Sequence, residues 1–156
     1  MPRAIGPIAV FAVLSLAAAC GSAPESPEDR LRAVLASIEE GAEANDAAAL
    51  KRCVSEHYGD SDGRDKQALA GVVAFHLLRN QSVHLFTRVG EIDFRVPGEA
   101  RADVLVAMAG SPIPSPEVLP ALRADLYRFE LRFRDEEGHW RLSSAAWRPA
   151  AVDDFR

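Results

Sequence analysis

The sequence predicts an α+β domain in which N-terminal helices pack in a strongly curved antiparallel sheet. Apolar residues recur at spacings of three and four up to Leu78, which is the period of an α-helix. From Val83 onward apolar and polar residues alternate, which is the period of a β-strand. Gly90 interrupts the first alternating segment and predicts a bulge that would bend this strand. Helices followed by antiparallel strands indicate the α+β class.

Two helices are predicted between residues 27 and 54. Ser26 is a suitable cap, Pro27 suits the first helical position, and Asp29 can bond back to the cap. The buried stripe of this first helix is predicted to be Leu31, Val34, Leu35, Ile38 and Ala42. Asn45 and Asp46 then break the helix and cap a second, short one that begins at residue 47.

The stretch from His57 to Leu78 is predicted to organise the rest of the fold. An acidic turn with two glycines, residues 57–65, leads into the apolar run 68–78. A helix that is apolar on nearly every side must be covered all round. We therefore expect it to be the central helix that the bent sheet wraps, with Phe75 and Leu78 against other helices or a partner subunit.

Antiparallel strands are predicted for the second half of the chain. The bent strand covers residues 83–96, a turn follows at 97–99, and the next strand covers 102–108. A long connection with three prolines, 110–120, leads to a helical turn near 118–122. The strand 125–133 is joined by the turn 135–138 to a return strand that begins with Trp140, Leu142, Ser144 and Ala146 and ends at Pro149.

Residues 1–19 are predicted to be a signal peptide. The apolar run 8–19 is too short for a stable membrane anchor. The segment Leu16-Ala17-Ala18-Ala19-Cys20 resembles the lipobox of bacterial lipoproteins, although Ala17 stands where leucine is commoner. The resemblance implies cleavage before Cys20 and lipidation of this cysteine. The alternative is an ordinary secretory signal cut near Ala19, which would leave Cys20 a thiol and allow a disulfide with Cys53.

This resemblance implies a location at the bacterial cell envelope, with the membrane as a partner through lipid on Cys20. Gly21 stands where a retention aspartate would otherwise be, so in a Gram-negative cell the expected location is the periplasm-facing outer membrane. The predicted organisation is a lipoprotein signal peptide at 1–19, a tether at 20–26, the domain at 27–149 and a loose tail at 150–156.

Composition excludes some classes of function. The chain has 156 residues with 18 Lys and Arg against 23 Asp and Glu, a formal net charge of −5. Because basic, aromatic-studded patches are missing from this acidic sequence, we expect no nucleic-acid partner. The sequence contains no phosphate-binding loop, no G-x-S-x-G nucleophile motif and no pair of histidines at helical metal-ligand spacing, so it predicts no cofactor and no metal.

The acidic turn allows two interpretations. Asp60, Asp62 and Asp65 cluster carboxylates as calcium sites do, but the glycine lies at the wrong position for an EF-hand loop. The simpler interpretation is that Asp62 or Ser61 caps the following helix and that Asp65 lies in its first turn. The sequence favours capping over calcium binding.

The order of elements, the bend at Gly90 and the segment Gly138-His139-Trp140-Arg141-Leu142 resemble the nuclear transport factor 2-like superfamily. The resemblance covers residues 28–148. It implies a cone of curved sheet that is closed by helices and often encloses a pocket. The superfamily contains enzymes, binding modules and dimerisation scaffolds, so membership does not by itself select an activity.

Candidate catalytic residues follow from the ketosteroid isomerase-like members, which use a carboxylate base beside a tyrosine and a second acid. Tyr58, Asp103, Asp125 and Tyr127 supply these residue types, without a residue-by-residue match. Asp125 and Tyr127 share a strand face, and His76 is the best candidate for a histidine base. In the alternative, Asp125 is solvated, Tyr127 lies in the core with a bonded hydroxyl, and His76 is a hydrogen-bonded core residue.

The sequence favours a binding or scaffolding role over catalysis, with a small apolar ligand in the cone. One alternative is a small-molecule isomerase, dehydratase or cyclase with a proton-transfer group in the cone. The other is a homodimer or partner-binding subunit that uses the outer face of the sheet. That face is predicted to carry Arg128, Glu130, Arg132 and Arg134.

Overall fold

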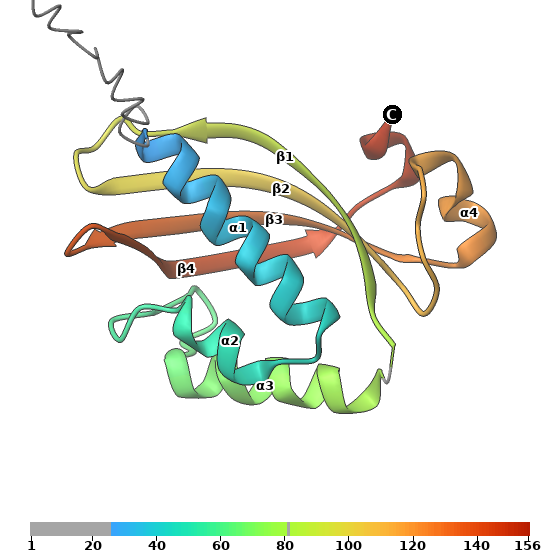
Figure 1. The fold of residues 1–156 in the computed structure, drawn as a ribbon, viewed down its shortest axis with the longest axis horizontal. Coiled ribbons are helices and arrows are strands. Elements are labelled where there is room, and N and C mark those ends of the chain that lie inside the picture. Colours follow the sequence, from blue (N-terminus) through green and yellow to red (C-terminus); the bar gives the residue numbers. More distant parts are fainter. Residues whose placement is uncertain (1–25, 81) are drawn as a thin grey trace, which may run out of the picture.

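The computed structural model describes residues 26–80 and 82–156 of the chain. The predicted signal peptide, its cleavage site, the proposed lipidation site Cys20 and nearly all of the tether lie outside these residues. Within the described part, three helices precede a four-stranded antiparallel sheet (Figure 1). This order confirms the predicted α+β class.

The helices begin where the sequence places caps. Helix α1 (Pro27–Glu43) starts with a reciprocal box in which the Asp29 amide donates to Ser26 Oγ at 3.0 Å and the Ser26 amide donates to Asp29 Oδ2 at 3.2 Å. Helix α2 (Ala47–Arg52) is capped by Asp46, whose Oδ1 accepts from the Ala49 amide at 2.8 Å. Helix α3 (Lys66–Arg79) follows the acidic turn.

The sheet has the strand order β1-β2-β3-β4, with every neighbouring pair antiparallel. The strands are β1 (His84–Asp93), β2 (Glu99–Ala109), β3 (Asp125–Glu136) and β4 (His139–Pro149). The register between β1 and β2 shifts between Val89 and Ile92, which confirms the bulge predicted at Gly90. A Cβ atom at Gly90 would lie 3.1 Å from the Asp103 carbonyl oxygen, so close backbone approach also favours glycine here.

A second bulge changes which face of the sheet β4 residues occupy. The register between β3 and β4 shifts after Arg132, so that Phe133 pairs with Leu142 but Phe129 pairs with Trp147. Strict alternation from Trp140 would have placed Ser144 and Ala146 on the buried face. The extra residue reverses this pattern, and Ala145 is buried instead.

The main hydrophobic core lies between α1 and the face of the sheet that α1 crosses, which we call the inner face (Figure 1). Leu31 of α1 is fully buried there, in the same core cluster as Phe133 of β3. Hydrogen bonds also join the helix to the sheet: Trp140 Nε1 donates to the Pro27 carbonyl at 3.1 Å, and Thr87 Oγ1 donates to Glu39 Oε2 at 2.7 Å. Helix α1 is therefore the central helix.

The prediction that the helix over residues 68–78 is central is wrong. Helix α3 lies along the outer boundary of the fold, next to α2, and does not cross the sheet (Figure 1). Leu69 is its one buried residue, whereas Phe75 is 56% exposed and Leu78 is 83% exposed. The rest of the protein thus covers only one side of α3.

A second, smaller core lies on the opposite, outer face of the sheet. Leu105 and Ala107 of β2 pack there against Leu119 and Phe155. These come from α4 (Leu119–Leu122), which follows the 3₁₀ turn η1 (Pro116–Val118), and from the C-terminal 3₁₀ turn η2 (Val152–Phe155). Phe155 is fully buried, so residues 150–156 are not the predicted loose tail; they cover one end of the sheet.

Candidate functional site

A row of aromatic rings lies on the inner face near the free end of the β3–β4 pair. The ring centroids of Tyr127 and Phe129 are 6.2 Å apart, and those of Phe129 and Trp147 are 6.1 Å apart. All three residues are half-buried. Phe129 and Trp147 pack against the main core together with Val73 of α3, without being covered by it. Apolar surface is therefore left open between α3 and this part of the sheet.

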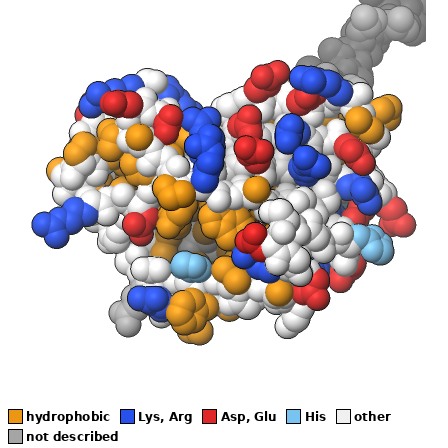
Figure 2. Space-filling model, turned by 180° about the vertical axis from the view of Figure 1, so that it is seen from behind, with side chains coloured by type: hydrophobic (Ala, Val, Ile, Leu, Met, Phe, Trp, Pro, Cys, Tyr) orange, Lys and Arg blue, Asp and Glu red, His pale blue; other side chains and the backbone are white. Residues whose placement is uncertain are grey.

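Figure 2 shows the molecule from the side opposite to that of Figure 1. A hollow is visible there, and hydrophobic side chains form much of its wall (Figure 2). A concave apolar surface with a few polar groups at its border is the usual form of a small-molecule site.

The acidic turn before α3 is held beside this aromatic row by Asp60. The Asp60 side chain has no exposed surface. Its Oδ2 accepts from Tyr58 Oη at 3.0 Å and from Arg64 Nε at 2.8 Å, and its Oδ1 accepts from the amides of Asp62 and Arg64, each at 3.0 Å. An antiparallel bridge between Gly59 and Asp65 closes the turn.

Arg64 connects this turn to the aromatic row. Its guanidinium carbon lies 4.5 Å from the centre of the Trp147 ring, while its Nε remains bonded to Asp60. A guanidinium on the face of an indole ring is attracted by the π-electrons and restricts the ring. The chain Tyr58–Asp60–Arg64–Trp147 therefore fixes one end of the row.

The electrostatics of the turn favour a carboxylate at position 60 and a neutral phenol at position 58. Burial by itself would raise the pKa of Asp60, but hydrogen bonds from Arg64 and Tyr58 outweigh it and hold this pKa below its ordinary value. Burial, together with the Asp60 carboxylate, raises the pKa of Tyr58 above its ordinary value. Tyr58 is thus a hydrogen-bond donor to Asp60, and its proton is not available for acid–base chemistry near neutral pH.

The structure brings two of the predicted catalytic residues to one face: Asp125 and Tyr127 both lie on the inner side of β3, and the others lie elsewhere. Asp103 is exposed on the outer face of β2, and Asp125 is exposed at the start of β3. His76 is also exposed, because it lies on α3 at the boundary of the fold, so it is not the hydrogen-bonded core residue of the alternative interpretation. Its ring contacts Phe75 edge-on, with centroids 6.0 Å apart. Tyr127 is the one candidate that lies in the aromatic row, and Tyr58 is bonded to Asp60.

The predicted capping residues are also placed differently from expectation. The N-cap of α3 is Asp65, whose Oδ1 accepts from the Ala68 amide at 2.8 Å. Ser61 and Asp62 lie in the turn before it, and Asp62 is paired with Arg64. The helix begins later than expected because the turn before it folds around Asp60, which the sequence offered as a member of a metal cluster. Asp60 accepts hydrogen bonds from Tyr58, Asp62 and Arg64.

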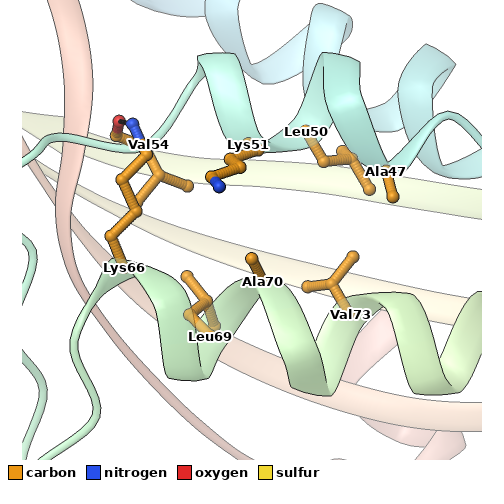
Figure 3. A pocket seen from close by; sticks show the side chains of 8 residues that line it. All are labelled: Ala47, Leu50, Lys51, Val54, Lys66, Leu69, Ala70 and Val73. Atoms are coloured by element: carbon orange, nitrogen blue, oxygen red, sulfur yellow. Dashed lines mark hydrogen bonds between the residues drawn. The ribbon is translucent and has the colours of Figure 1, made fainter.

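Two further hollows border α3 and the acidic turn. The first lies between α2 and α3, is lined by Leu50, Leu69 and Val73 among others, and has a volume of about 20 Å³, which is room for one water molecule (Figure 3). Lys66 crosses its end and donates to the Val54 carbonyl at 2.7 Å. The second, of about 280 Å³, is an open polar groove between residues 59–61 and the outer side of β3 and β4.

Residues 26–80 and 82–156 show neither a metal-binding cluster nor a membrane-spanning helix. This part of the chain holds no group of three or more histidine, cysteine or carboxylate side chains arranged for a metal ion. None of its helices is both long and apolar enough to cross a membrane.

The residues that sequence reasoning missed are Arg64 and Trp147. An arginine four residues after an aspartate within a turn is a weak signal for an internal ion pair. Trp147 gave no signal, since its place on the inner face depends on the bulge in β4.

Comparison by sequence alone gives no relatives: no protein-family model matches the chain, and no curated protein matches it. Comparison by structure gives clear likenesses. An NTF2-like protein of unknown function from Shewanella baltica has a TM-score of 0.57 at 15% identity, covering 80% of this chain and 94% of that one. A putative dehydratase of the NTF2-like family from Streptomyces avermitilis has a TM-score of 0.60 at 14% identity, covering 81% of this chain and 99% of that one. An uncharacterised protein with a cystatin-like fold from Caulobacter vibrioides has a TM-score of 0.59 at 15% identity, covering 81% and 91%.

These likenesses agree with the order of helices followed by a curved antiparallel sheet. The fold hosts proteins named as dehydratases as well as proteins of unknown function. The chain has the nuclear transport factor 2-like α+β fold.

Proposed function

We propose that this protein is an exported, lipid-anchored binding module that holds a small apolar ligand against its aromatic row without transforming it. The observation that carries the proposal is the row Tyr127–Phe129–Trp147, which lies half-buried on the inner face. Phe129 and Trp147 pack against the same core as Val73 of α3. Aromatic rings offer a large, rigid apolar surface, and stacking on them is worth about 0.5–1.5 kcal/mol per ring pair beyond the area buried.

The surroundings of the row support binding over proton transfer. Asp60, the carboxylate nearest to the row through Arg64, is saturated with hydrogen bonds and is held as an anion. The other proposed acids and bases, Asp103, Asp125 and His76, are exposed to solvent. An effective general base must lie within hydrogen-bond reach of a bound substrate. Asp103 lies on the outer face and does not meet that condition; Asp125 shares the inner face with Tyr127 but is solvated at the start of β3.

A neutral fluorescent probe, N-phenyl-1-naphthylamine, tests the ligand site. Phe129→Ala is expected to weaken probe binding about tenfold, because one ring contact of the row is lost. Phe94→Ala is the matched control: Phe94 is also half-buried and pairs with a tryptophan, Trp140, at 5.8 Å, but it lies at the opposite end of the sheet. Equal weakening in both variants, or no saturable binding by the wild type, would contradict the proposal.

The second candidate function is an isomerase, dehydratase or cyclase. It is favoured by Tyr127, whose hydroxyl-bearing ring belongs to the row, and by the likeness to a protein named as a dehydratase. Tyr127→Phe separates the two candidates. A binding module keeps its ligand affinity in this variant, whereas an enzyme that polarises its substrate with this hydroxyl loses turnover while still binding the probe.

The proposed anchor is lipid on Cys20. Its support is the lipobox-like segment that ends at this cysteine. Several acyl chains, at ~0.8 kcal/mol per buried methylene, hold a protein durably on a membrane. Cys20→Ala is expected to release the protein from the membrane fraction and to prevent incorporation of labelled palmitate. Membrane association of this variant equal to that of the wild type would contradict the anchor.

A further inference from the structure

One end of the fold brings together the start of α1, the turn between β1 and β2, and the turn between β3 and β4 (Figure 1). Trp140 joins the first two, because its ring centroid lies 5.8 Å from that of Phe94 and its Nε1 donates to the Pro27 carbonyl at 3.1 Å. The Asp135 amide donates to the Gly98 carbonyl at 2.8 Å, which joins the two turns. These five residues hold one end of the domain, which we call the tether end.

The turn between β1 and β2 carries an exposed apolar tip, Val96 and Pro97. Val96 is 53% exposed, and Pro97 is exposed beside it. The Glu99 amide donates to the Val96 carbonyl at 3.0 Å and Gly98 has a φ of 73°, which is the pattern of a type II turn with proline and glycine at its centre. The tip is therefore held in one shape before it meets a partner, and ordering it on contact costs little.

The length of chain before α1 limits how far the tether end lies from a membrane. Ser26 follows Cys20 by six positions, and six fully extended residues reach about 20 Å. Strand β2, with 11 residues, is about 36 Å long, so even a fully extended tether is shorter than the sheet. Lipid on Cys20 therefore keeps the tether end close to the bilayer surface, and a short tether gives a surface at this end a high effective concentration there.

We propose that the Val96–Pro97 tip contacts the lipid bilayer in the anchored protein, so that the domain stands on its tether end. This contact rests on the lipid proposed for Cys20. A lipid surface suits the tip because two adjacent apolar side chains on a rigid turn can enter the boundary between headgroups and acyl chains, where their apolar area leaves water. The Arg95 side chain, 83% exposed beside the tip, can lay its methylene stem along this boundary and keep its charge among the headgroups.

The charges around the tip favour the apolar part of the interface over anionic headgroups. Arginines of the turn and of the neighbouring strands are each paired with a carboxylate: Arg95 with Asp93 at 2.8 Å, Arg101 with Glu130 at 3.7 Å, and Arg134 with Glu99 at 3.6 Å. A surface that attracts anionic lipids carries clusters of Lys and Arg without such partners. The contact is therefore expected to depend little on lipid charge and on salt.

This orientation turns the aromatic row away from the bilayer. Tyr127 lies near the start of β3 and Trp147 near the end of β4, at the end of the sheet opposite to the β3–β4 turn. The C-terminal end of α3 lies toward that same end, because Asn80 is four residues before His84, where β1 begins. A ligand of the row then exchanges with the aqueous space and not with the bilayer.

Quenching of a fluorescent label by lipid tests the orientation. The lipidated full chain with Cys53→Ala is labelled with nitrobenzoxadiazole at Arg95→Cys or at Leu78→Cys, two positions that are each 83% exposed. The protein is reconstituted into phosphatidylcholine vesicles that contain doxyl-labelled lipid. The label at position 95 is expected to be quenched about fivefold more than the label at position 78, because only a label at the bilayer surface meets the quencher. Added phosphatidylglycerol or high salt is expected to leave this difference unchanged.

Aspartate at the tip tests whether the contact is apolar. Val96→Asp is expected to lower the quenching at position 95 about threefold, because a carboxylate resists leaving water. Phe75→Asp is the matched control: Phe75 is 56% exposed against 53% for Val96, but it lies on α3, so the quenching is expected to stay unchanged. Both sites are exposed, so both variants are expected to fold, and urea unfolding checks this.

The outcomes distinguish a failure of the tip contact from a failure of the anchor. A protein that neither floats with the vesicles nor takes up labelled palmitate overturns both. A protein that floats with the vesicles but is quenched at position 78 as much as at position 95, or more, keeps the anchor and overturns the tip contact. The tip contact is also overturned by quenching that Val96→Asp leaves unchanged, or by a contact that needs phosphatidylglycerol and disappears in high salt.

Discussion

Helices α1 and α3 differ in a way that reverses the expectation from their sequences. Helix α1 is apolar along one stripe only, yet it lies at the centre of the fold and buries Leu31 completely. Helix α3 is apolar on nearly every side, yet Leu69 is its one buried residue and Leu78 is 83% exposed. The number of apolar residues on a helix therefore does not measure how central the helix is.

The polar residues explain the difference. The polar side of α1 is used for orientation: Glu39 accepts from Thr87, Glu43 accepts from the Leu85 amide, and the Arg30 guanidinium donates to the Gly138 carbonyl. These bonds fix α1 on the sheet at three points along its length. Helix α3 has no comparable bonds to the strands among the described residues; Lys66 bonds Val54 and Glu56, which precede the helix. In this fold, the helix that bonds the sheet through its polar side is the one that is held on it.

The largest expected effect separates the two helices directly. Leu31→Ala should lower the free energy of unfolding by about 3 kcal/mol, because it leaves a cavity in a fully packed core. Leu78→Ala removes the same atoms from the exposed side of α3 and should cost under ~0.5 kcal/mol, because Leu78 is 83% exposed. Urea unfolding of both variants measures the contrast. Equal losses would mean that α3 is as central as α1.

A second expected effect concerns how each helix begins. The lowered pKa of Asp60 means that its stabilising contribution is present above the ordinary aspartate pKa of about 3.9 and is lost as the pH falls through the lower, folded-state pKa. Asp60→Asn should cost about 2 kcal/mol at pH 7, the scale of lost hydrogen bonds to a charged group, and should flatten the acid limb of the stability curve below pH ~4.

Asp29, in the first turn of α1, is the matched control for this effect. Hydrogen bonds from Ser26 also lower its pKa, but the carboxylate is exposed to solvent, so Asp29→Asn should change stability less. Thermal melts of both variants from pH 7 to pH 3 give the comparison. An acid limb that stays as steep in Asp60→Asn as in the wild type would show that Asp60 does not contribute to the loss of stability in acid.

Much of the fold could be predicted from the sequence because its signals are local. The Ser26–Asp29 box, the Asp46 cap and the bulge at Gly90 each depend on a few adjacent residues, and each is present. So is the turn before β4, where Glu137 and Gly138 both have positive φ. Phe155 could not be predicted as a core residue, since a short segment near the chain end shows no periodicity.

The candidate site was less predictable because it depends on contacts between distant segments. Alternation in β3 places Tyr127 and Phe129 on one face, but the row is completed by Trp147 only because the β4 bulge reverses its alternation. From its residue types alone, the acidic turn could either cap the following helix or bind a metal ion. Its actual arrangement depends on Arg64 reaching Asp60 and Trp147 at once, which sequence spacing alone does not specify.

The smallest expected effect refines where α3 begins. Asp65 accepts from the Ala68 amide, so Asp65→Ala should cost about 1 kcal/mol, the usual loss for a helix cap. Asp62→Ala should cost under ~0.5 kcal/mol, because Asp62 is 62% exposed and its ion pair with Arg64 is supplemented by Asp60. Chemical unfolding at neutral pH with added EDTA resolves the two. The order of the losses decides between caps, since a larger loss in Asp62→Ala would place the functional start of α3 three residues earlier than the structure does.

Added calcium provides a further test of the turn. Because the Asp60 carboxylate already accepts hydrogen bonds through both oxygens, calcium should leave the melting temperature of the wild type unchanged. A substantial rise in the wild type that Asp62→Ala abolishes would show that the turn binds the ion and that Asp60 exchanges its internal partners for it.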